Sequence, residues 1–533
     1  MRKMLIVGLA GLSMCAITAC GGGEGGNGGN PDPGNGGGPG YTPGVFPPSA
    51  QFAARCQVPR TGNDPFGSPW PDQPGTALLE KHFLRSWTHE FYLWADEVPD
   101  RNPFHTGGSS GGVLQYFDLL KTTVLDDSGQ PKDAFHFAYD TNEYWQLALA
   151  GAVQGYGISW AILRDNPPID VRVEFVQDGT AAAAGGVHRG ARLLAIDGLD
   201  VVNATAATIN AINSALFDPA AGSVHTLLFR ERDGSGTFQA SLTAGTFAFD
   251  AVPAWNVFNH GGRKVGYLLF NDHTAMAEWE LRSAVAGLAA QQVEELVLDL
   301  RYNGGGFLDI ASELAYMIAG PAATEGRVFE RRVFNSKHTG NVDPVTGEPL
   351  DTPFHSRTLG YSVEAGHPLP HLDLSRVLVL TSPRTCSASE SIINGLRGIG
   401  IEVIQVGGTT CGKPYGFYPR DNCGTTYFSI QFGGVNALGF GEYTQGFSAT
   451  RATGNPMANL PGCGAADDLS HELGDPQEGQ LQAALHYLAN GSCPPVMLAA
   501  ESAAPQGGPW PADSAVLRKP PPKPWENNRI LRR

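Results

Sequence analysis

The chain has 533 residues, which is long enough for two or three domains with sizeable cores. Its formal net charge of −16 and its pI of about 5.3 argue against a nucleic acid as the partner. These numbers exclude little else.

The first residues have the pattern of a secretory signal peptide, 1–19. Arg2 and Lys3 form a basic start, and the apolar stretch 4–18 is too short to span a bilayer comfortably. Small residues then precede Cys20, which resembles the lipobox of bacterial lipoproteins and implies cleavage before Cys20 and lipidation of that residue. The alternative is an ordinary signal peptide with an incidental cysteine.

The resemblance to lipoproteins implies a place in the bacterial cell envelope. The lipid at Cys20 would anchor the chain to a membrane. Gly21 stands where an aspartate would suggest retention at the inner membrane. We therefore expect the outer membrane, with the chain facing the periplasm.

Two segments have compositions that do not support a packed core. Residues 20–50 are dominated by Gly, Pro and Asn, and are expected to be a flexible tether. Residues 493–533 are rich in Pro and Ala, and we expect them to be mostly disordered. No later apolar run is long enough for a membrane helix, so the body is expected to be soluble.

The cysteines predict disulfides. Cleavage removes Cys15 and lipidation uses Cys20, which leaves six of the eight cysteines. An even number in an exported chain favours disulfides over a zinc site, for which no Cys-x-x-Cys spacing is present. Cys411 and Cys423 bracket a loop typical of a hairpin, so we expect them to pair. The other pairings cannot be derived from the sequence.

Residues 51–149 are expected to form a helical N-terminal domain. Residues 76–97 carry an apolar stripe with helical spacing, and residues 113–125 give a second helix. The aromatic side chains of this region are expected to pack in its core.

Residues 150–246 change to short strands and glycine turns. Strands are expected over 169–175, 192–198 and 224–230, and a helix over 206–217. The region resembles a PDZ domain, and the likeness rests on segments 155–158, 179–187 and 190–198.

The first of these segments, Gly155-Tyr156-Gly157-Ile158, is similar to the loop that presents backbone N–H groups to a peptide carboxylate in PDZ domains. The alternative is a turn without a ligand.

From residue 250 to residue 492, strands and helices alternate. We expect strands over 265–270, 296–300, 377–381 and 403–406, and helices over 276–290, 308–318 and 389–397. That order indicates βαβ units and a largely parallel sheet. The fold class expected for the whole chain is therefore α/β and α+β, in several domains.

Ser387 is a candidate nucleophile in this core. It follows a buried strand and starts a helix, where unpaired backbone N–H groups stabilise negative charge. The N–H of Ala388 is then available to an oxyanion. The alternatives are that Ser387 is only the N-cap of the helix, or that Ser389 takes either role.

Lys413 is a candidate general base. A lysine accepts a proton only when the pKa of its ammonium group is lowered, and burial among apolar side chains lowers it. Val406, Tyr415 and Phe417 are the candidate neighbours, and Gly412 allows the backbone to approach closely. The alternative is a solvated loop lysine.

A glycine turn offers a further oxyanion donor. The segment Asn303-Gly304-Gly305-Gly306 follows the strand at 296–300, so its N–H groups are expected at the carboxyl edge of the sheet, where α/β active sites form. We expect the N–H of Gly306 to act beside that of Ala388. A phosphate-binding turn is the alternative, but the P-loop lysine pattern and the dinucleotide spacing are absent.

Together these motifs resemble the C-terminal processing peptidases, or tail-specific proteases, a family of serine peptidases with a Ser–Lys dyad. Residues 299–306 match the family's Asp-Leu-Arg-x-Asn-x-Gly-Gly segment. Residues 387–390 match its Ser-Ala-Ser-Glu, and Gly412-Lys413 matches its Gly-Lys. The resemblance covers roughly residues 76–488, with the PDZ-like region in the family's order.

The resemblance implies an endopeptidase that cleaves proteins or peptides and recognises their free C-termini. Ser387 would attack the scissile carbonyl and Lys413 would take its proton. The N–H groups of Ala388 and Gly306 would hold the oxyanion, and the loop 155–158 would bind the C-terminus. No metal or organic cofactor is implied.

The sequence departs from the family at the residue that orients the lysine. Many members have a glutamine four residues after it, where this chain has Phe417, so Gln431 and Tyr415 are the candidates for that role. A catalytically inactive lipoprotein that binds peptides or other ligands with the same fold is therefore the alternative. His136 offers a further alternative, a serine–histidine arrangement as in tricorn-type peptidases.

Overall fold

The computed structural model describes residues 40–126, 129–450, 452–495, 517 and 528–529. Contacts divide the chain into Met1–Gly40 and Tyr41–Arg533, and all that is described except Gly40 belongs to the second unit. The expected signal peptide, the lipidation site Cys20 and most of the tether lie outside the described residues. Within these residues, no helix is both long enough and apolar enough to cross a membrane.

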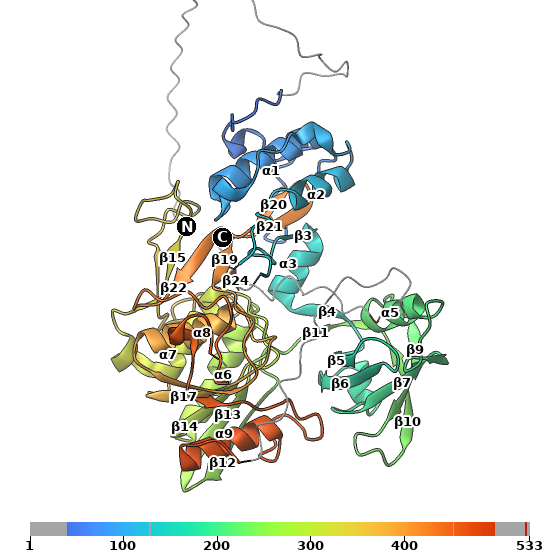
Figure 1. The fold of residues 1–533 in the computed structure, drawn as a ribbon, viewed down its shortest axis with the longest axis vertical. Coiled ribbons are helices and arrows are strands. Elements are labelled where there is room, and N and C mark those ends of the chain that lie inside the picture. Colours follow the sequence, from blue (N-terminus) through green and yellow to red (C-terminus); the bar gives the residue numbers. More distant parts are fainter. Residues whose placement is uncertain (1–39, 127–128, 451, 496–516, 518–527, 530–533) are drawn as a thin grey trace, which may run out of the picture. The chain divides into compact units, whose positions relative to one another are not determined.

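The second unit contains a six-stranded sheet, at the lower left in Figure 1. Its strand order is β12-β13-β14-β17-β18-β23, and all neighbours are parallel except β12 and β13. Its strands are β12 (Ala254–His260), β13 (Arg263–Leu269), β14 (Glu295–Asp299), β17 (Arg376–Thr381), β18 (Glu402–Gly407) and β23 (Gly462–Cys463). The apolar runs of β14 and β17 are buried, as parallel strands between two layers require. The predicted parallel sheet is confirmed.

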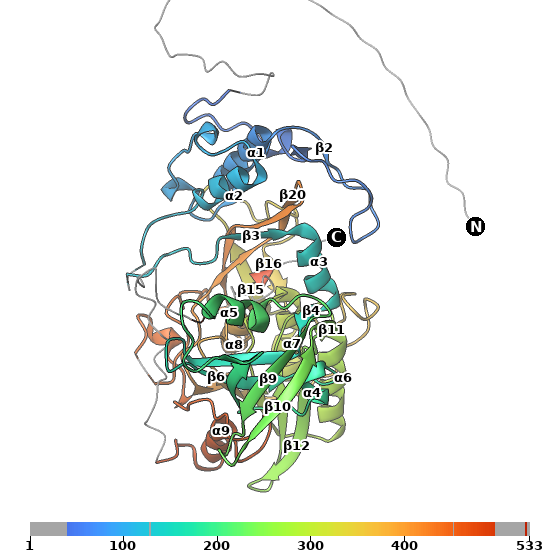
Figure 2. The same cartoon turned by 90° about the vertical axis from the view of Figure 1, so that its right-hand side faces the viewer.

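Helices cover both faces of this sheet. On one face, α6 (Ala277–Ala290), α7 (Leu308–Thr324) and α8 (Ala388–Gly398) share an apolar core with the strands. On the other face, α9 (Gly479–Asn490) packs in a second core. In Figure 2, α6 and α9 lie on opposite sides of β12, the edge strand of this sheet. The sheet therefore holds its loops at a rigid edge, and the candidate motifs follow β14 and β17.

The region predicted to resemble a PDZ domain is an antiparallel sheet with its own core. The strand order is β10-β9-β7-β6-β5, with β8 beside β7. The strands are β5 (Ile158–Arg164), β6 (Asp170–Val176), β7 (Arg192–Ile196), β8 (Leu199–Asp200), β9 (Val224–Arg230) and β10 (Thr237–Thr243), and the helices are α4 (Ala181–Ala184) and α5 (Ile209–Phe217). Strands β4 (Ala152–Gly155) and β11 (Gly245–Ala248) pair where the chain enters and leaves it.

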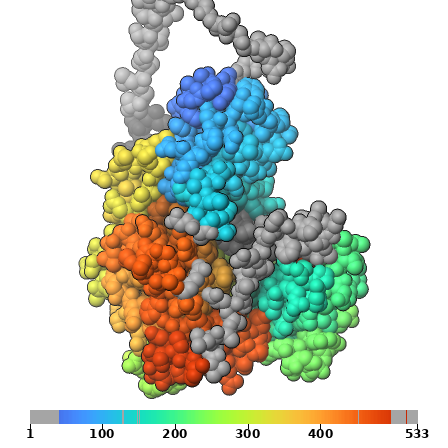
Figure 3. Space-filling model, viewed as in Figure 1, coloured from blue at the N-terminus to red at the C-terminus, as the bar shows by residue number. Residues whose placement is uncertain are grey.

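The N-terminal region is helical, as expected, but one of its strands pairs with a strand from the C-terminal half of the chain. Its elements are β1 (Arg55–Cys56), β2 (Gln73–Pro74), α1 (Ala77–Phe91), α2 (Ser110–Asp118), β3 (Phe137–Asp140) and α3 (Thr141–Ala150), with short 3₁₀ helices at Ser49–Gln51, Ala95–Glu97 and Pro103–His105. Strand β3 pairs with β21 (Thr425–Phe428), which follows β20 (Arg420–Asn422) in a hairpin. In the space-filling view, the blue N-terminal residues adjoin orange residues from the C-terminal half of the chain (Figure 3).

A further sheet has the order β16-β15-β22-β19-β24. Its strands are β15 (Val328–Val333), β16 (Asp351–Pro353), β19 (Tyr415–Phe417), β22 (Phe432–Val435) and β24 (Asn528–Arg529); one more 3₁₀ helix spans Pro456–Ala458. Strand β24 comes from the tail that we expected to be mostly disordered, and it runs parallel to β19. Leu517, from the same tail, is buried in the core of the β5–β10 sheet. Most other residues of the tail lie outside the described ones.

The predicted pair Cys411–Cys423 is wrong. The disulfides are Cys56–Cys423, Cys386–Cys411 and Cys463–Cys493. Between Cys411 and Cys423 the chain forms β19, which pairs with β22. This strand leads the chain away from Cys411. Cys423 then lies at the turn of the β20–β21 hairpin, which β3 of the N-terminal region joins. Distance along the sequence was therefore a poor guide to distance in space.

Candidate active site

Ser387 lies in a tight turn between the loop after β17 and the start of α8. Its backbone has φ 64° and ψ −118°, a conformation that residues other than glycine rarely adopt. Its side chain is fully buried. The predicted position at a helix N-terminus is therefore present, in a strained form.

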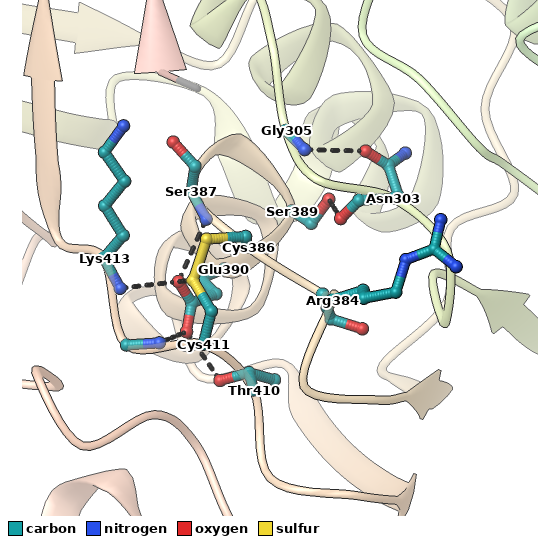
Figure 4. The surroundings of a disulfide bond; sticks show 12 residues. Asn303, Gly305, Arg384, Cys386, Ser387, Ser389, Glu390, Thr410, Cys411 and Lys413 are labelled. Carbon is teal, nitrogen blue, oxygen red and sulfur yellow. Dashed lines mark hydrogen bonds between the residues drawn. A yellow bond between two sulfur atoms is a disulfide. The ribbon is translucent and has the colours of Figure 1, made fainter. Parts of the chain in front are cut away.

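The side chain of Glu390 connects Ser387 to Lys413 (Figure 4). Its Oε2 accepts hydrogen bonds from the N–H of Ser387 at 2.9 Å and from the N–H of Lys413 at 2.8 Å. Its Oε1 accepts from the N–H of Gly412 at 2.9 Å and from the hydroxyl of Thr410 at 2.5 Å. Burial raises the pKa of this carboxyl, and the four donors oppose the rise. One buried side chain thus holds the two candidate motifs together.

A disulfide joins the same two loops. Cys386 directly precedes Ser387, and its partner Cys411 stands two residues before Lys413, with the two Cα atoms 5.1 Å apart. The N–H of Cys411 also donates to the carbonyl of Thr385 at 3.0 Å. Figure 4 shows the side chains of Ser387 and Lys413 extending to the same side of this bond. The structure therefore brings the predicted nucleophile and the predicted base into one site.

This disulfide also decides whether the site offers metal ligands. Cys386, Glu390 and Cys411 form the one group of three possible ligands within the described part of the chain. Both cysteines are bonded to each other, so neither sulfur is a thiolate. The group acts as a structural link in this state.

Lys413 is fully buried and lies against aromatic rings. Its Nζ is 4.6 Å from the ring centre of Phe135 and 4.5 Å from that of Phe417. Gly412, with φ 85°, is needed beside it because a Cβ there would lie 2.2 Å from the carbonyl oxygen of Thr444. The alternative of a solvated loop lysine is therefore excluded.

Other predicted neighbours of Lys413 have different contacts. Gln431 accepts a hydrogen bond from the N–H of Tyr418 at 3.0 Å through its side-chain oxygen. The ring of Tyr415 meets that of Trp94 edge to face. Val406 belongs to the core on the α9 face of the sheet. Of the expected set, Phe417 is the residue whose ring faces the ammonium group.

The glycine turn after β14 packs directly on Ser387. A Cβ at Gly305, where φ is 99°, would lie 2.7 Å from the Cβ of Ser387 and 2.9 Å from the nitrogen of Ala388. The N–H of Gly305 donates to the side-chain oxygen of Asn303 at 3.0 Å. Gly306 follows with φ 146°, against the backbone of His273.

Two bonds to the Asn303 carbonyl hold this turn to the serine loop. The N–H of Cys386 donates to it at 3.1 Å, and the hydroxyl of Ser389 donates to it at 3.1 Å. Ser389 therefore binds the turn and has a structural role in this arrangement. The nucleophile assignment stays with Ser387.

Comparison with known proteins agrees with this geometry. Residues 264–417 match the family model described as Peptidase family S41. The name S41 domain is used for this matched segment. This match agrees with the predicted class of serine-type peptidase.

Similar proteins extend the likeness beyond the S41 domain. The chain is 26% identical over 270 residues to a carboxyl-terminal-processing protease of Picosynechococcus sp., covering 50% of this chain and 56% of the relative. It is 25% identical over 212 residues to a protein of the same name from Synechocystis sp., covering 38% of this chain and 46% of the relative. The chain thus spans about half the length of these curated relatives.

A solved structure shares the fold. A Bacteroides fragilis protein whose structure is described as that of an S41 protease has a TM-score of 0.57 and 20% identity. The match covers 77% of this chain and 97% of that one. This likeness supports the α/β multidomain fold and carries no statement about substrate.

The loop at 155–158 lies outside the S41 domain, at the turn from β4 into β5. The hydroxyl of Tyr156 donates to the carbonyl of Ala215 in α5 at 2.7 Å. Gly157 has φ 86°, and a Cβ there would lie 2.1 Å from the hydroxyl oxygen of Thr180. The predicted turn is present and rests on α5.

His136 packs inside the N-terminal region. One ring nitrogen is 3.0 Å from the carbonyl oxygen of Phe117, and its ring stacks on that of Phe117. Burial lowers the pKa of His136 to about 4, which keeps the ring neutral at ordinary pH. These contacts give it a structural role and remove the support for a serine–histidine site.

The sequence did not reveal three features around Ser387 and Lys413. These are the Cys386–Cys411 bond, the hydrogen bonds of Glu390, and the contact of Phe135 with the lysine. A signal existed for the first, because each cysteine stands within two residues of a candidate catalytic residue. Nothing local marks Phe135, which reaches Lys413 from more than 270 residues earlier in the chain.

Proposed function

We propose that the chain is a serine endopeptidase of the cell envelope, with Ser387 as nucleophile and Lys413 as general base. The observation that carries this proposal is the double connection between their loops. The Glu390 carboxylate binds the backbone N–H groups of both residues. The Cys386–Cys411 disulfide fixes the same loops covalently. Such fixed geometry is what a two-residue proton transfer requires.

The reaction would proceed through an acyl-enzyme. The Ser387 oxygen attacks the scissile carbonyl carbon while its proton passes to the Lys413 amine, and the carbonyl oxygen becomes an oxyanion. The N–H groups of Ala388 and Gly306 hold this oxyanion, since the N–H of Gly305 is engaged by Asn303. The carbon–nitrogen bond then breaks, and the ammonium of Lys413 returns a proton to the leaving amine. Water hydrolyses the ester by the same steps in reverse order.

Substrate selection is assigned to the β5–β10 sheet and to β19. The turn at 155–158, before β5, is the candidate site for a free peptide carboxylate, as in PDZ domains. The edge of β19 already accepts an extended segment, because Asn528 and Arg529 pair with Gly416 and Phe417. β19 begins two residues after Lys413. An unfolded substrate could therefore add a strand beside the dyad.

The chain would act at a membrane through a lipid on Cys20, in the periplasm-facing leaflet of the outer membrane. The flexible composition of residues 20–50 would let the body move away from the bilayer. Metabolic labelling with a radioactive fatty acid, lost in Cys20→Ser, tests this part separately from activity.

The test of the dyad uses residues 41–533 and an unfolded protein with a free apolar C-terminus. Fragments would be followed by mass spectrometry for the wild type, Ser387→Ala, Lys413→Ala and the matched control Ser389→Ala. We expect cleavage by the wild type and Ser389→Ala, and none above background by the other two. A substrate whose C-terminus is amidated should be cleaved more slowly if the carboxylate is recognised.

The inactive binding protein remains the rival reading, and one observation favours it: Lys413 lies between rings that stabilise its charged form. Saturable binding of the substrate C-terminus without cleavage by the wild type would establish that alternative. Cleavage that survives Ser387→Ala would contradict the assigned nucleophile.

A further inference from the structure

We propose that the rings of Phe135 and Phe417 form an aromatic cage that positions the Lys413 side chain for catalysis. The inference rests on the proposed function and assigns the orienting role that the sequence left open. Both ring centres lie within 4.6 Å of the lysine Nζ, inside the range of a cation–π contact. Both rings act through the Lys413 side chain and are therefore positioning residues.

Phe417 is held in place from behind by other rings. It is fully buried, and its ring meets those of Phe428 at 5.2 Å and Phe137 at 6.0 Å between centres. Phe137 stacks on Phe428 at 4.5 Å. These contacts leave the ring little freedom, so the face that it presents to Lys413 is preorganised.

Phe135 reaches the site from the N-terminal region. Its N–H donates to the Asp133 carboxylate at 2.9 Å, and Asp133 in turn accepts from the hydroxyl of Tyr92 at 2.6 Å. The segment is therefore fixed by side chains that belong to neither the serine loop nor the lysine loop. The S41 domain alone would lack this half of the cage.

The cage balances two opposing effects on the ammonium group. Complete burial disfavours the charged form, whereas the electron-rich ring faces favour it. Among the described residues, the titratable groups that face the site are Glu390 from α8, which binds the Lys413 N–H, and Tyr415 from β19, on which the charges of Glu97, Asp126 and Asp133 act; Asp133 also binds the N–H of Phe135. Burial raises the pKa of Tyr415 to about 12, so it stays neutral in the working range.

The experiment measures kcat and KM from pH 5 to pH 10 for Phe135→Leu and Phe417→Leu. Leucine keeps the site apolar but removes the ring face. The amine form of Lys413 then becomes populated at lower pH, so the acidic limb of kcat/KM should move down by about one pH unit. Looser placement of the base should also lower kcat by roughly ten- to a hundredfold, with KM little changed.

Two further variants separate positioning from general packing. Phe135→Tyr keeps a ring face at a partly exposed position and should restore the wild-type limb and most of kcat. Phe137→Leu removes a ring of the same segment that packs behind the cage without facing the lysine, and should lower stability while moving the acidic limb less than Phe135→Leu does. If Phe417→Leu does not fold, Phe135→Leu decides the outcome.

The cage is overturned if Phe135→Leu keeps the wild-type acidic limb, or if Phe137→Leu moves it equally. Activity of the wild type, and its loss in Ser387→Ala, in the same assay show that the proposed function stands whatever the cage variants do. An NMR titration of ε-¹³C-labelled lysine in Ser387→Ala, with and without Phe135→Leu, gives the same answer without turnover. If Phe135→Leu leaves the pKa of Lys413 unchanged in this titration, the proposal is wrong.

Discussion

Glu390 shows how a single buried carboxylate can organise a site without taking part in the reaction. Each of its oxygens accepts two hydrogen bonds, and the four donors come from both candidate motifs. A carboxylate can satisfy four donors, whereas an amide offers one acceptor oxygen and a nitrogen that donates. At this position the carboxylate chemistry therefore matters more than the size of the side chain.

Glu390→Gln should accordingly lower both stability and activity. Whichever way the amide turns, its nitrogen faces at least one backbone N–H, which leaves a buried donor unpaired. We expect the free energy of unfolding to fall by about 2 kcal/mol and kcat/KM by roughly a hundredfold. Urea unfolding and peptide cleavage measure the two effects.

A control for this change is available on the surface. Glu442 is exposed and accepts one hydrogen bond, from the side chain of Asn455. Glu442→Gln should leave both quantities within error of the wild type. If Glu390→Gln behaves like it, the links between Ser387 and Lys413 do not hold the site.

At the scale of elements, the candidate site is formed by three loops at one edge of the parallel sheet. The loop after β14 carries the glycine turn, the loop after β17 carries Ser387, and the loop after β18 carries Lys413. Neighbouring parallel strands deliver their carboxyl ends to the same edge, so the order β14-β17-β18 brings these loops together.

This explains why the candidate dyad could be placed from the sequence and the links between its loops could not. The apolar runs at 296–300 and 377–381 and the turn glycines are local signals, and they gave the correct strands and loops. The partner of Cys423 and the contact of Phe135 with Lys413 both go with the pairing of β3 with β21. That pairing joins segments far apart in the sequence, which hydrophobic periodicity does not reveal.

The Cys386–Cys411 bond can be tested against a disulfide of similar span. Its cysteines are 25 residues apart, and those of Cys463–Cys493 are 30 apart. In the chain-entropy model, loss of either bond should therefore reduce stability by about 3 kcal/mol. Replacing Cys386 and Cys411 with alanine should also lower kcat strongly, because these loops carry the dyad. The double alanine variant of Cys463 and Cys493 should keep its activity below its melting temperature.

Urea unfolding gives the stability of each double variant, and cleavage of one peptide substrate gives its kcat. Equal losses of activity in the two double variants would mean that the bond beside Ser387 contributes stability alone.

At the scale of the whole molecule, the N-terminal region shares structure with the S41 domain and with the strands that follow it. The Cys56–Cys423 bond joins residues 367 positions apart. The N–H of Leu93 donates to the carbonyl of Ile430, and the side chain of Asn335 donates to the carbonyl of Tyr92. Tyr92, Tyr144 and Trp145 also lie in the same apolar core as α6, α7 and α8.

Ion pairs make a second long-range connection, from the β5–β10 sheet to the candidate site. Arg189 donates to the Asp467 carboxylate at 2.6 Å and to the hydroxyl of Tyr302 at 2.6 Å. Arg384, three residues before Ser387, pairs with Glu174 of β6. The glycine turn and the serine loop are thus each in contact with that sheet through a charged side chain.

These contacts predict that the N-terminal region unfolds together with the S41 domain. Hydrogen exchange at increasing urea should show α1 and β14 losing protection at the same concentration, because α1 packs with Tyr427 of β21 in one core, and Tyr92 and Ala95, which follow α1, lie in the apolar core of β14. In the double variant Cys56→Ala and Cys423→Ala, the unfolded chain gains freedom worth up to about 5 kcal/mol, and α1 should open first. Since Phe135 belongs to the region that opens, cleavage activity should fall with the protection of α1. Separate unfolding of α1 and β14 in the wild type would instead mean that the N-terminal region is an independent domain, and that Lys413 is held without it.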